Sequence, residues 1–142
     1  MTPAEAYELT MVALALWREA RGEPYEVRKA VASVILNRRR ISAKTPSKPD
    51  WWGEDLVGIV TAPFQFTSIS VRNDPQLNKW PKRIDKQWQE CQDIAVAVVT
   101  DSLADTTMGA THYFDISIPA PAWADAGKFT VQLGRLRFFK LA

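Results

Sequence analysis

Two apolar runs with helical spacing, separated by the four-residue junction Arg21–Pro24, constrain the fold of this chain more than any other feature. The first run, from Pro3 to Ala20, places its apolar residues on one stripe of a helix: Leu9, Val12, Ala13, Leu16, Trp17 and Ala20. The second run, from Tyr25 to about Arg39, repeats the pattern with Val27, Ala30, Val31, Val34 and Ile35. Gly22 suits the end of a helix, and Pro24 suits the first turn of the next one. The sequence therefore predicts a helix–turn–helix hairpin with a tight connection.

The rest of the chain predicts a third helix and a small β element. Between Arg40 and Trp80 the helical spacing fades and prolines recur, so we expect ordered loop with one short helical turn at Glu54–Val60. A third helix is expected from about Arg83 to Leu103, with these residues on one face: Ile84, Trp88, Cys91, Ala95, Val98 and Ser102. The segments "ATHYFD" and "FTVQLGRLRFFK" are rich in aromatic and β-branched residues and flank the turn-prone "PAPAWADAG", which indicates strands. We predict one mainly helical (α+β) domain over residues 1–142.

Composition and the amino-terminal residues set the broad class. The chain has 142 residues, a formal net charge of +2 and a single cysteine, Cys91, so it forms no internal disulfide. The first apolar run lacks a basic segment before it and is shorter than the ~20 residues of a membrane span. We therefore expect synthesis in the cytoplasm without a signal peptide, and no membrane insertion.

The acids at the junction have both a structural and a chemical interpretation. At about 100° per residue, Glu19 lies beside Val12 and Ala15, at the edge of the apolar stripe, while Arg18 points elsewhere. Burial of a carboxyl there raises its pKa, as a general acid needs at neutral pH, whereas Arg18 or Arg21 close by would lower it, and the sequence leaves both outcomes open. Glu23 and Glu26 have a simpler explanation, because acids near the start of a helix complement its dipole. Spacing alone leaves a solvated corner as the alternative for all three.

Four segments, taken in order, resemble the SleB/CwlJ-like cell wall hydrolases. "LALWREARGEPYEVRKAVASVILNR" resembles the family's E-A-R-G-E segment and the apolar helix ending in Asn-Arg that follows it. "FQFTSIS" resembles the Gln-Phe-Ser segment, and "ATHYFD" resembles the Tyr-rich strand. "VQLGRLRFFK" is similar to a terminal Ile-Gly-x-His-x-Phe stretch. The four segments span most of the chain.

This resemblance implies a lysozyme-like fold of the lytic transglycosylase type, acting on the glycan strands of peptidoglycan. It implies Glu19 as the catalytic acid, Gln65 as a substrate-binding glutamine and Tyr113 as a substrate-side tyrosine. Thr67 replaces the family's Ser and keeps a hydroxyl, so it is also expected to bind substrate. Leu136 stands where the family usually has His, which puts any role of that imidazole in doubt.

Cleavage of the β-1,4 bond between N-acetylmuramic acid and N-acetylglucosamine needs a proton on the leaving oxygen. In a lytic transglycosylase one acid, here Glu19, suffices, because the 6-hydroxyl of the substrate closes on the anomeric carbon. We favour this mechanism. The alternative is a hydrolytic muramidase (lysozyme) that uses a second carboxylate, with Glu23 or Asp55 as the candidates; Glu23 is also placed on the substrate side.

The remaining chemically distinctive side chains have mostly structural interpretations. His112, the sole histidine, is expected to be packed in an aromatic strand, and with Cys91 it makes no metal-ligand pattern, so we predict no metal and no cofactor. Trp17 and Trp88 are expected in the core, and Phe64 and Phe66 are expected to pack a loop down. The loop tryptophans can either pack or form sugar platforms: Trp51, Trp52 and Trp80.

Two other function classes stay open. The basic run Asn37–Arg40, followed by Lys44 and Lys48, is typical of nucleic-acid binding, but the low net charge argues against a dominant phosphate-binding surface, so no nucleic-acid partner is expected. A non-catalytic wall-binding domain is the other class, because Leu136 replaces the family His. For the favoured enzyme we expect a monomer, a phage or prophage endolysin released with the help of a separate holin-type protein.

Overall fold

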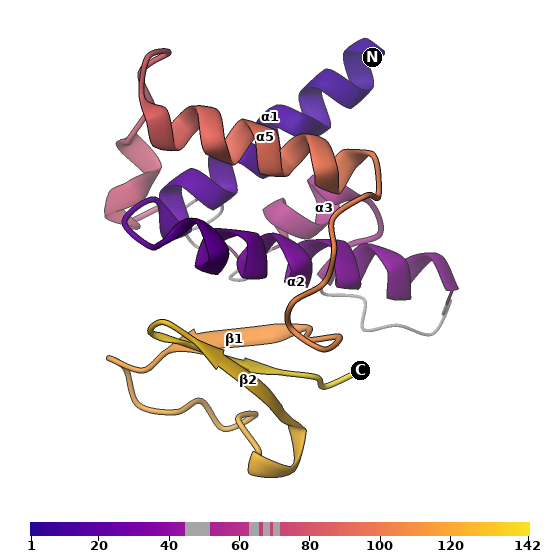
Figure 1. Cartoon of the computed structure of the whole chain (residues 1–142), viewed down its shortest axis with the longest axis vertical. Coiled ribbons are helices and arrows are strands. Elements are labelled where there is room, and N and C mark those ends of the chain that lie inside the picture. The colour runs from indigo at the N-terminus through magenta and orange to yellow at the C-terminus, as the bar shows by residue number, and fades with distance from the viewer. Residues whose placement is uncertain (45–51, 63–65, 67–68, 70–71) are drawn as a thin grey trace.

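The computed structural model describes residues 1–44, 52–62, 66, 69 and 72–142. Its α-helices are α1 (Pro3–Ala20), α2 (Tyr25–Lys44), α3 (Leu56–Thr61) and α5 (Lys86–Val99), and its short 3-10 helices are η2 (Pro75–Asn78) and η3 (Ala126–Lys128). Its strands are β1 (His112–Asp115), β2 (Phe129–Leu133) and β3 (Leu136–Phe139). In Figure 1, α2 lies between this sheet and the pair α1 and α5. The fold is mainly helical with a small sheet, as predicted.

The helical hairpin forms at the predicted residues. The side chain of Thr2 caps α1 by accepting a hydrogen bond from the Glu5 amide at 3.1 Å, with proline in the first turn. At the junction, the Arg21 amide donates to the Trp17 carbonyl, and the Arg28 amide donates to the Pro24 carbonyl at 3.1 Å. Both ends of the connection are thereby tied to the helices that it joins.

Helix α2 is longer than its apolar pattern predicts, because it ends at Lys44. Its last turn is held by tertiary contacts. The Ser42 hydroxyl donates to the Gly53 carbonyl at 3.0 Å and accepts from the indole Nε1 of Trp52 at 2.9 Å. Trp52 itself is fully buried, so of its two predicted roles it has that of a packing residue and not that of a sugar platform. A helix end stabilised in this way leaves no trace in the hydrophobic spacing.

Helix α5 is shorter than predicted at both ends. Asp85 caps its start by accepting hydrogen bonds from the amides of Gln87 and Trp88, so Ile84 stands outside the helix and is exposed. After Thr100 the backbone of Asp101 enters the left-handed region at φ 54°, which ends the helix. A cap and a backbone turn therefore set bounds that apolar periodicity alone does not reveal.

The sheet is antiparallel with the order β1-β3-β2, and both hairpin strands occur where the sequence predicts them. Tyr113 pairs with Phe138 and Asp115 pairs with Leu136, so these residues share one face. Leu136 and Phe138 on that face belong to the main hydrophobic core.

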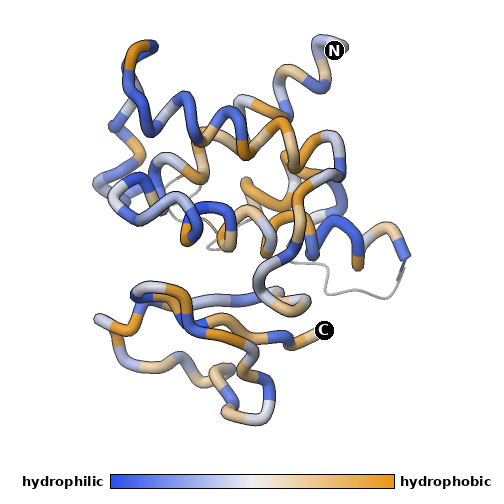
Figure 2. The backbone as a smooth tube through the Cα atoms, viewed as in Figure 1, coloured by the Kyte–Doolittle hydropathy of each residue, from blue (hydrophilic) through white to orange (hydrophobic). Residues whose placement is uncertain are grey.

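The main core gathers between the helices and this face of the sheet. Figure 2 shows hydrophobic segments where the helices face one another and along the sheet. The largest fully buried side chains come from several elements: Trp52, Phe66, Phe138, Leu16, Ile35 and Leu36. Trp17 is buried and Trp88 packs against the core, as predicted. Within the described ranges no helix has the length and the apolar character needed to cross a membrane.

Candidate active site

Glu19 lies in the last turn of α1 and is half-buried, at the edge of the face that carries the fully buried Val12 and Ala15. This is the position that helical geometry predicts for it. The neighbouring Arg18 leaves α1 in another direction, where its Nε donates to the Lys79 carbonyl at 3.0 Å and its guanidinium lies 4.5 Å from the centre of the Trp80 ring. Arg18 and Glu19, although adjacent in sequence, therefore point to different sides of α1.

Tyr113 of β1 lies within electrostatic reach of Glu19. Burial raises the pKa of the Tyr113 phenol well above its usual range, and the negative charge of Glu19 raises it further. The ring packs 5.7 Å from that of Phe138, its partner across the sheet, so the phenol stays neutral and fixed. The carboxyl at the end of α1 and the hydroxyl on β1 thus belong to one site, although about two thirds of the chain's length separates them in sequence.

Arg38 of α2 is the third residue of this site and carries its positive charge. Its side chain is buried, its Nε donates to the Thr111 carbonyl at 2.8 Å, and its guanidinium lies 5.8 Å from the ring centre of Trp52 and 5.9 Å from that of Phe66. Burial lowers the pKa of Arg38 to about 10, and Tyr113 acts in the opposite direction. A positive charge is therefore held close to the phenol, at the start of the strand that carries it.

Sequence reasoning missed this role of Arg38, because it treated the residue as part of a basic run and of a family segment. The signal was present in the helical spacing. Arg38 follows Val31 by seven positions and Val34 by four, so it continues the apolar stripe of α2. A cation on a stripe that faces the core needs a specific environment, since an isolated buried charge is costly.

The rest of the basic run is used inside the fold. Asn37 donates through Nδ2 to the Ala110 carbonyl at 2.9 Å and to Asp105 at 3.1 Å. Arg39 donates to the Val98 carbonyl, and Arg40 pairs with Asp101 at 2.7 Å. Burial alone would raise the pKa of Asp105, but hydrogen bonds from its neighbours, Asn37 among them, hold it below the usual range. These contacts fasten α2 to the segment before β1, whereas Lys48 lies outside the described residues.

His112 points to the other face of β1. Its Nδ1 lies 2.9 Å from the Thr111 hydroxyl, and its ring centre lies 5.0 Å from that of Trp123. Burial lowers the pKa of His112 to about 4, with a smaller effect from the charge of Arg38. The same outer face holds an aromatic cluster that is separate from the main core: Phe114, Trp123, Phe129 and Phe139. His112 is thus a packed neutral side chain, as the sequence predicts.

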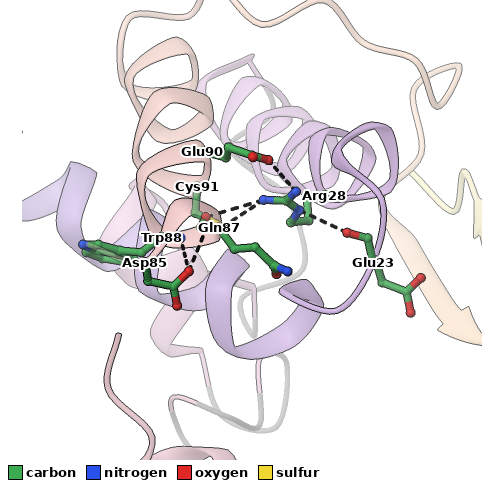
Figure 3. Close-up of polar contacts among 7 residues, drawn as sticks. All are labelled: Glu23, Arg28, Asp85, Gln87, Trp88, Glu90 and Cys91. Carbon is green, nitrogen blue, oxygen red and sulfur yellow. Dashed lines mark hydrogen bonds and ion pairs between the residues drawn. The ribbon is translucent and has the colours of Figure 1, made fainter. Parts of the chain in front are cut away.

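Glu23 lies on the junction with its backbone and side chain in separate environments. Its carbonyl accepts a hydrogen bond from Nε of Arg28 at 3.2 Å, while its carboxylate points away from that guanidinium (Figure 3). A Cβ built on Gly134, in the turn between β2 and β3, would lie 3.9 Å from Oε2 of Glu23 and 3.0 Å from Val27. Gly134 has φ +57°, a backbone conformation that favours glycine. Because glycine has no side chain, the turn can approach the junction closely.

Arg28 fixes the junction to α5. Its Nη2 donates to Glu90 at 2.6 Å, and its Nη1 lies near the Gln87 carbonyl and the Cys91 thiol (Figure 3). Burial acts to lower the pKa of Arg28, but the hydrogen bonds to Glu90 and Cys91 hold it above the usual value. The contact with the Glu23 carbonyl makes this buried pair a clamp between the start of α2 and α5.

The other predicted site residues have varied positions. Gln65, Thr67, Phe64 and Trp51 lie outside the described residues, and Phe66 between them is fully buried, as predicted. Asp55 caps α3 by accepting from the Gly58 amide at 2.7 Å. Leu136 packs in the main core. In the described ranges no three His, Cys, Asp or Glu side chains gather in a way that holds a metal ion.

The comparisons with known proteins agree on one family. The model of the Cell Wall Hydrolase family matches residues 22–139. A spore cortex-lytic enzyme of Halalkalibacterium halodurans is 32% identical over 118 residues, covering 82% of this chain and 29% of the relative. A second, from Oceanobacillus iheyensis, is 31% identical over 135 residues, covering 94% of this chain and 41% of the relative. The chain thus spans less than half the length of these relatives.

A solved structure has the same fold. The catalytic domain of the germination-specific lytic transglycosylase SleB from Bacillus anthracis superposes with a TM-score of 0.67 at 25% sequence identity. The superposition covers 94% of this chain and 93% of that domain. The similarity therefore extends over nearly all of the chain.

Proposed function

This chain belongs to the cell wall hydrolase family, and from that membership we propose that it cleaves the β-1,4 bond between N-acetylmuramic acid and N-acetylglucosamine in peptidoglycan, as a lytic transglycosylase. The related proteins are spore cortex-lytic enzymes, and the superposed domain is a lytic transglycosylase. The proposal transfers that activity to this chain.

One observation carries the assignment of Glu19: its charge acts on the buried phenol of Tyr113. Glu19 is half-buried at the end of an 18-residue helix, and Tyr113 is held by pairing within the sheet. A carboxyl and a neutral hydroxyl on rigid elements form a suitable pair for a sugar whose leaving oxygen must be protonated.

In the proposed reaction, Glu19 donates its proton to the glycosidic oxygen as the bond from that oxygen to C1 breaks. The 6-hydroxyl oxygen of the same sugar forms the new bond to C1, and its proton passes to the ionised Glu19. No water is consumed, the acid is regenerated, and the product carries a 1,6-anhydro end. Tyr113 is proposed to orient the substrate by a hydrogen bond, and Gln65 and Thr67 are proposed as further substrate contacts on the basis of the family resemblance.

The alternative is a hydrolytic muramidase, which needs a second carboxylate. Of the two candidates, Asp55 is occupied as a helix cap, which leaves Glu23, whose carboxylate lies by the turn at Gly134. The non-catalytic alternative rests on Leu136, and the packing of Leu136 in the core supports a structural role at that position. Action as a monomer, synthesis in the cytoplasm and release by a separate holin-type protein remain part of the proposal.

The decisive experiment is mass spectrometry of the soluble products that wild-type protein and Glu19→Gln release from purified peptidoglycan. The matched control is Glu23→Gln, the same change four residues further on. We expect products with anhydro ends, each one water lighter than a reducing end, from the wild type and from Glu23→Gln. Glu19→Gln is expected to lower the rate by about 10³-fold or more.

The other outcomes separate the alternatives. Reducing ends that disappear in Glu23→Gln would establish the hydrolase, with Glu23 as the second carboxylate. Products that persist undiminished in Glu19→Gln would refute the assignment of the acid. Folded wild-type protein that releases nothing from any wall tested would favour the binding domain.

A further inference from the structure

A pocket on the far side of α1 from Glu19 has no part in the mechanism above. It has a volume of about 270 Å³ and is lined by Thr10, Leu14, Trp80, Pro81, Arg83 and Trp88. Thr10 precedes Glu19 by nine positions, which at about 100° per residue places the two on opposite sides of the helix. We call this cavity the Trp80 pocket.

The wall of the Trp80 pocket is fastened to α1 at three points. The Arg21 guanidinium donates to Oε1 of Gln76 at 2.6 Å, and Nε of Arg18 donates to the Lys79 carbonyl at 3.0 Å. At the other end of the segment, the indole Nε1 of Trp17 donates to Oδ2 of Asp85 at 3.1 Å. The segment before α5 is therefore held in place on both sides of Trp80, so the pocket is pre-formed.

Trp80 offers a large aromatic surface to this pocket. The side chain is 69% exposed, although one face of its ring is covered by the Arg18 guanidinium. An exposed indole fixed in orientation suits the apolar C–H face of a pyranose ring, which packs against aromatic faces. The volume of the pocket is below that of a site for a drug-sized ligand and is of the order of a single sugar residue.

Arg83 lines the pocket, and three lysines that stand close to Trp80 and Arg83 in the sequence, Lys79, Lys82 and Lys86, are exposed like Arg83. The one acid of that segment, Asp85, is engaged by the Trp17 indole and by two amides of α5. Since the whole chain carries a net charge of only +2, this segment concentrates more positive charge than the molecule has overall. Such a rim attracts carboxylates.

We propose that the Trp80 pocket is a second binding site for the wall polymer, separate from the Glu19 site. One amino sugar packs on Trp80, and the carboxylates of the attached peptide pair with the basic rim. Because the two sites face opposite sides of α1, the pocket holds the protein on the insoluble wall and takes no part in bond cleavage. The identity of this ligand rests on the proposed function, since peptidoglycan combines amino sugars with acidic peptides.

The test measures co-sedimentation with purified insoluble peptidoglycan in the Glu19→Gln background, so that binding is measured without turnover. Trp80→Ala and Arg83→Glu are expected to weaken binding about tenfold each, and Trp80→Phe to retain most of it. The matched controls are Ile118→Ala and Lys128→Glu, at exposed positions between β1 and β2. Both are expected to bind normally. Circular dichroism verifies that each variant is folded.

A second measurement distinguishes this site from the active site. In the wild-type background, the ratio of activity on insoluble peptidoglycan to activity on soluble glycan chains is expected to fall about tenfold in Trp80→Ala, and to stay constant in Ile118→Ala. Unchanged sedimentation of Trp80→Ala would overturn the proposal, as would an equal loss of activity on both substrates. If Trp80→Ala loses binding to phosphatidylglycerol vesicles while it still sediments with peptidoglycan, the proposal is also overturned, in favour of a lipid surface.

The two proposals can fail separately. If folded wild-type protein cleaves no peptidoglycan while Trp80→Ala still loses sedimentation, the proposed activity fails and the binding site stands. If cleavage occurs with anhydro ends and sedimentation is insensitive to Trp80, the activity stands and the binding site fails.

Discussion

Helix α2 contains two arginines, Arg28 and Arg38, that are buried to the same extent but in opposite environments. Each exposes only 4% of its surface. Arg28 contacts a carboxylate at 2.6 Å, and its hydrogen bonds hold its pKa above the usual value. Arg38 donates to a backbone carbonyl, and its guanidinium lies near two aromatic rings. Burial lowers its pKa to about 10. One residue type on one helix thus fulfils two different tasks.

The difference shows that what surrounds a buried charge says more about its role than burial does. Arg28 joins the junction carbonyl of Glu23 to the carboxylate of Glu90 on α5. Arg38 lies beside Tyr113, whose phenol also responds to Glu19. We therefore interpret Arg28 as a structural clamp and Arg38 as a positioning residue of the candidate site.

The sharpest way to break this comparison is to remove the clamp. Arg28→Leu is expected to lower the free energy of unfolding by about 2–3 kcal/mol, because it removes charged hydrogen bonds of a buried guanidinium and leaves the half-buried Glu90 without its partner. Urea denaturation measures the loss. The double variant Arg28→Leu/Glu90→Leu, in which no charge is left alone, is expected to recover much of it. Wild-type stability in Arg28→Leu would remove the distinction between the two arginines.

The complementary change tests the positioning role. Arg38→Met is expected to lower the rate of peptidoglycan cleavage by about 10–100-fold, because the strand that carries Tyr113 loses its hydrogen bond at Thr111 and the nearby charge. The loss of stability is expected to be no more than about 1–2 kcal/mol, the cost of one unpaired carbonyl. Kinetics on soluble glycan chains, together with urea denaturation, separate the two effects. Arg38→Lys, which keeps the charge, is expected to retain more activity than Arg38→Met, and equal rates in the two variants would contradict a role for the charge.

The smallest expected effect is a shift at His112, which is the only histidine and so gives a single NMR signal to titrate. Its pKa is expected near 4 in the wild type and is expected to rise only slightly in Arg38→Met, because burial is the larger cause. Arg28→Lys, at the distant clamp, is the control and is expected to leave the pKa of His112 unchanged. An equal shift in both variants would show that the effect is not local.

The same histidine makes stability depend on pH. Its pKa in the folded state is lower than the ordinary 6.5, so the unfolded chain takes up the proton first as the pH falls. Stability is therefore full above pH 6.5 and is lost progressively down to pH 4, by up to about 3 kcal/mol. His112→Phe is expected to flatten this part of the profile, measured by urea denaturation from pH 7 to pH 4.

Much of the fold was predictable because it follows from local patterns. The hairpin from Pro3 to about Arg39 follows from apolar spacing with a glycine and a proline at the turn, and the strands follow from aromatic and β-branched residues. What escaped prediction depends on contacts distant in sequence. The last turn of α2 is held by Trp52 and Gly53, and the position of the Lys79–Asp85 segment is held by Arg18 and Trp17.

The candidate site was predictable only in part for the same reason. Helical geometry placed Glu19, and the family resemblance singled out Tyr113, but neither indicated that Arg38 lies near two buried aromatic rings and within electrostatic reach of the phenol. The available signal was the position of Arg38, a charged residue, on the apolar stripe of α2. That the loop residue Trp52 is fully buried while Trp80 is exposed has no local signature, because both stand in similar proline-rich sequence.

The order of the strands has a consequence for how the protein is made. β3 is the last strand along the chain but lies in the middle of the sheet, between β1 and β2. A ribosome adds residues at about 5–20 per second. Strand β1 therefore leaves the ribosome before β3 and stays unpaired until residues 136–139 have left the exit tunnel. A nascent chain carries Glu19 well before it carries β3, yet the strand that brings Tyr113 beside Glu19 is secured only by these late residues. Any product truncated before Leu136 is thus expected to have the acid but no assembled site.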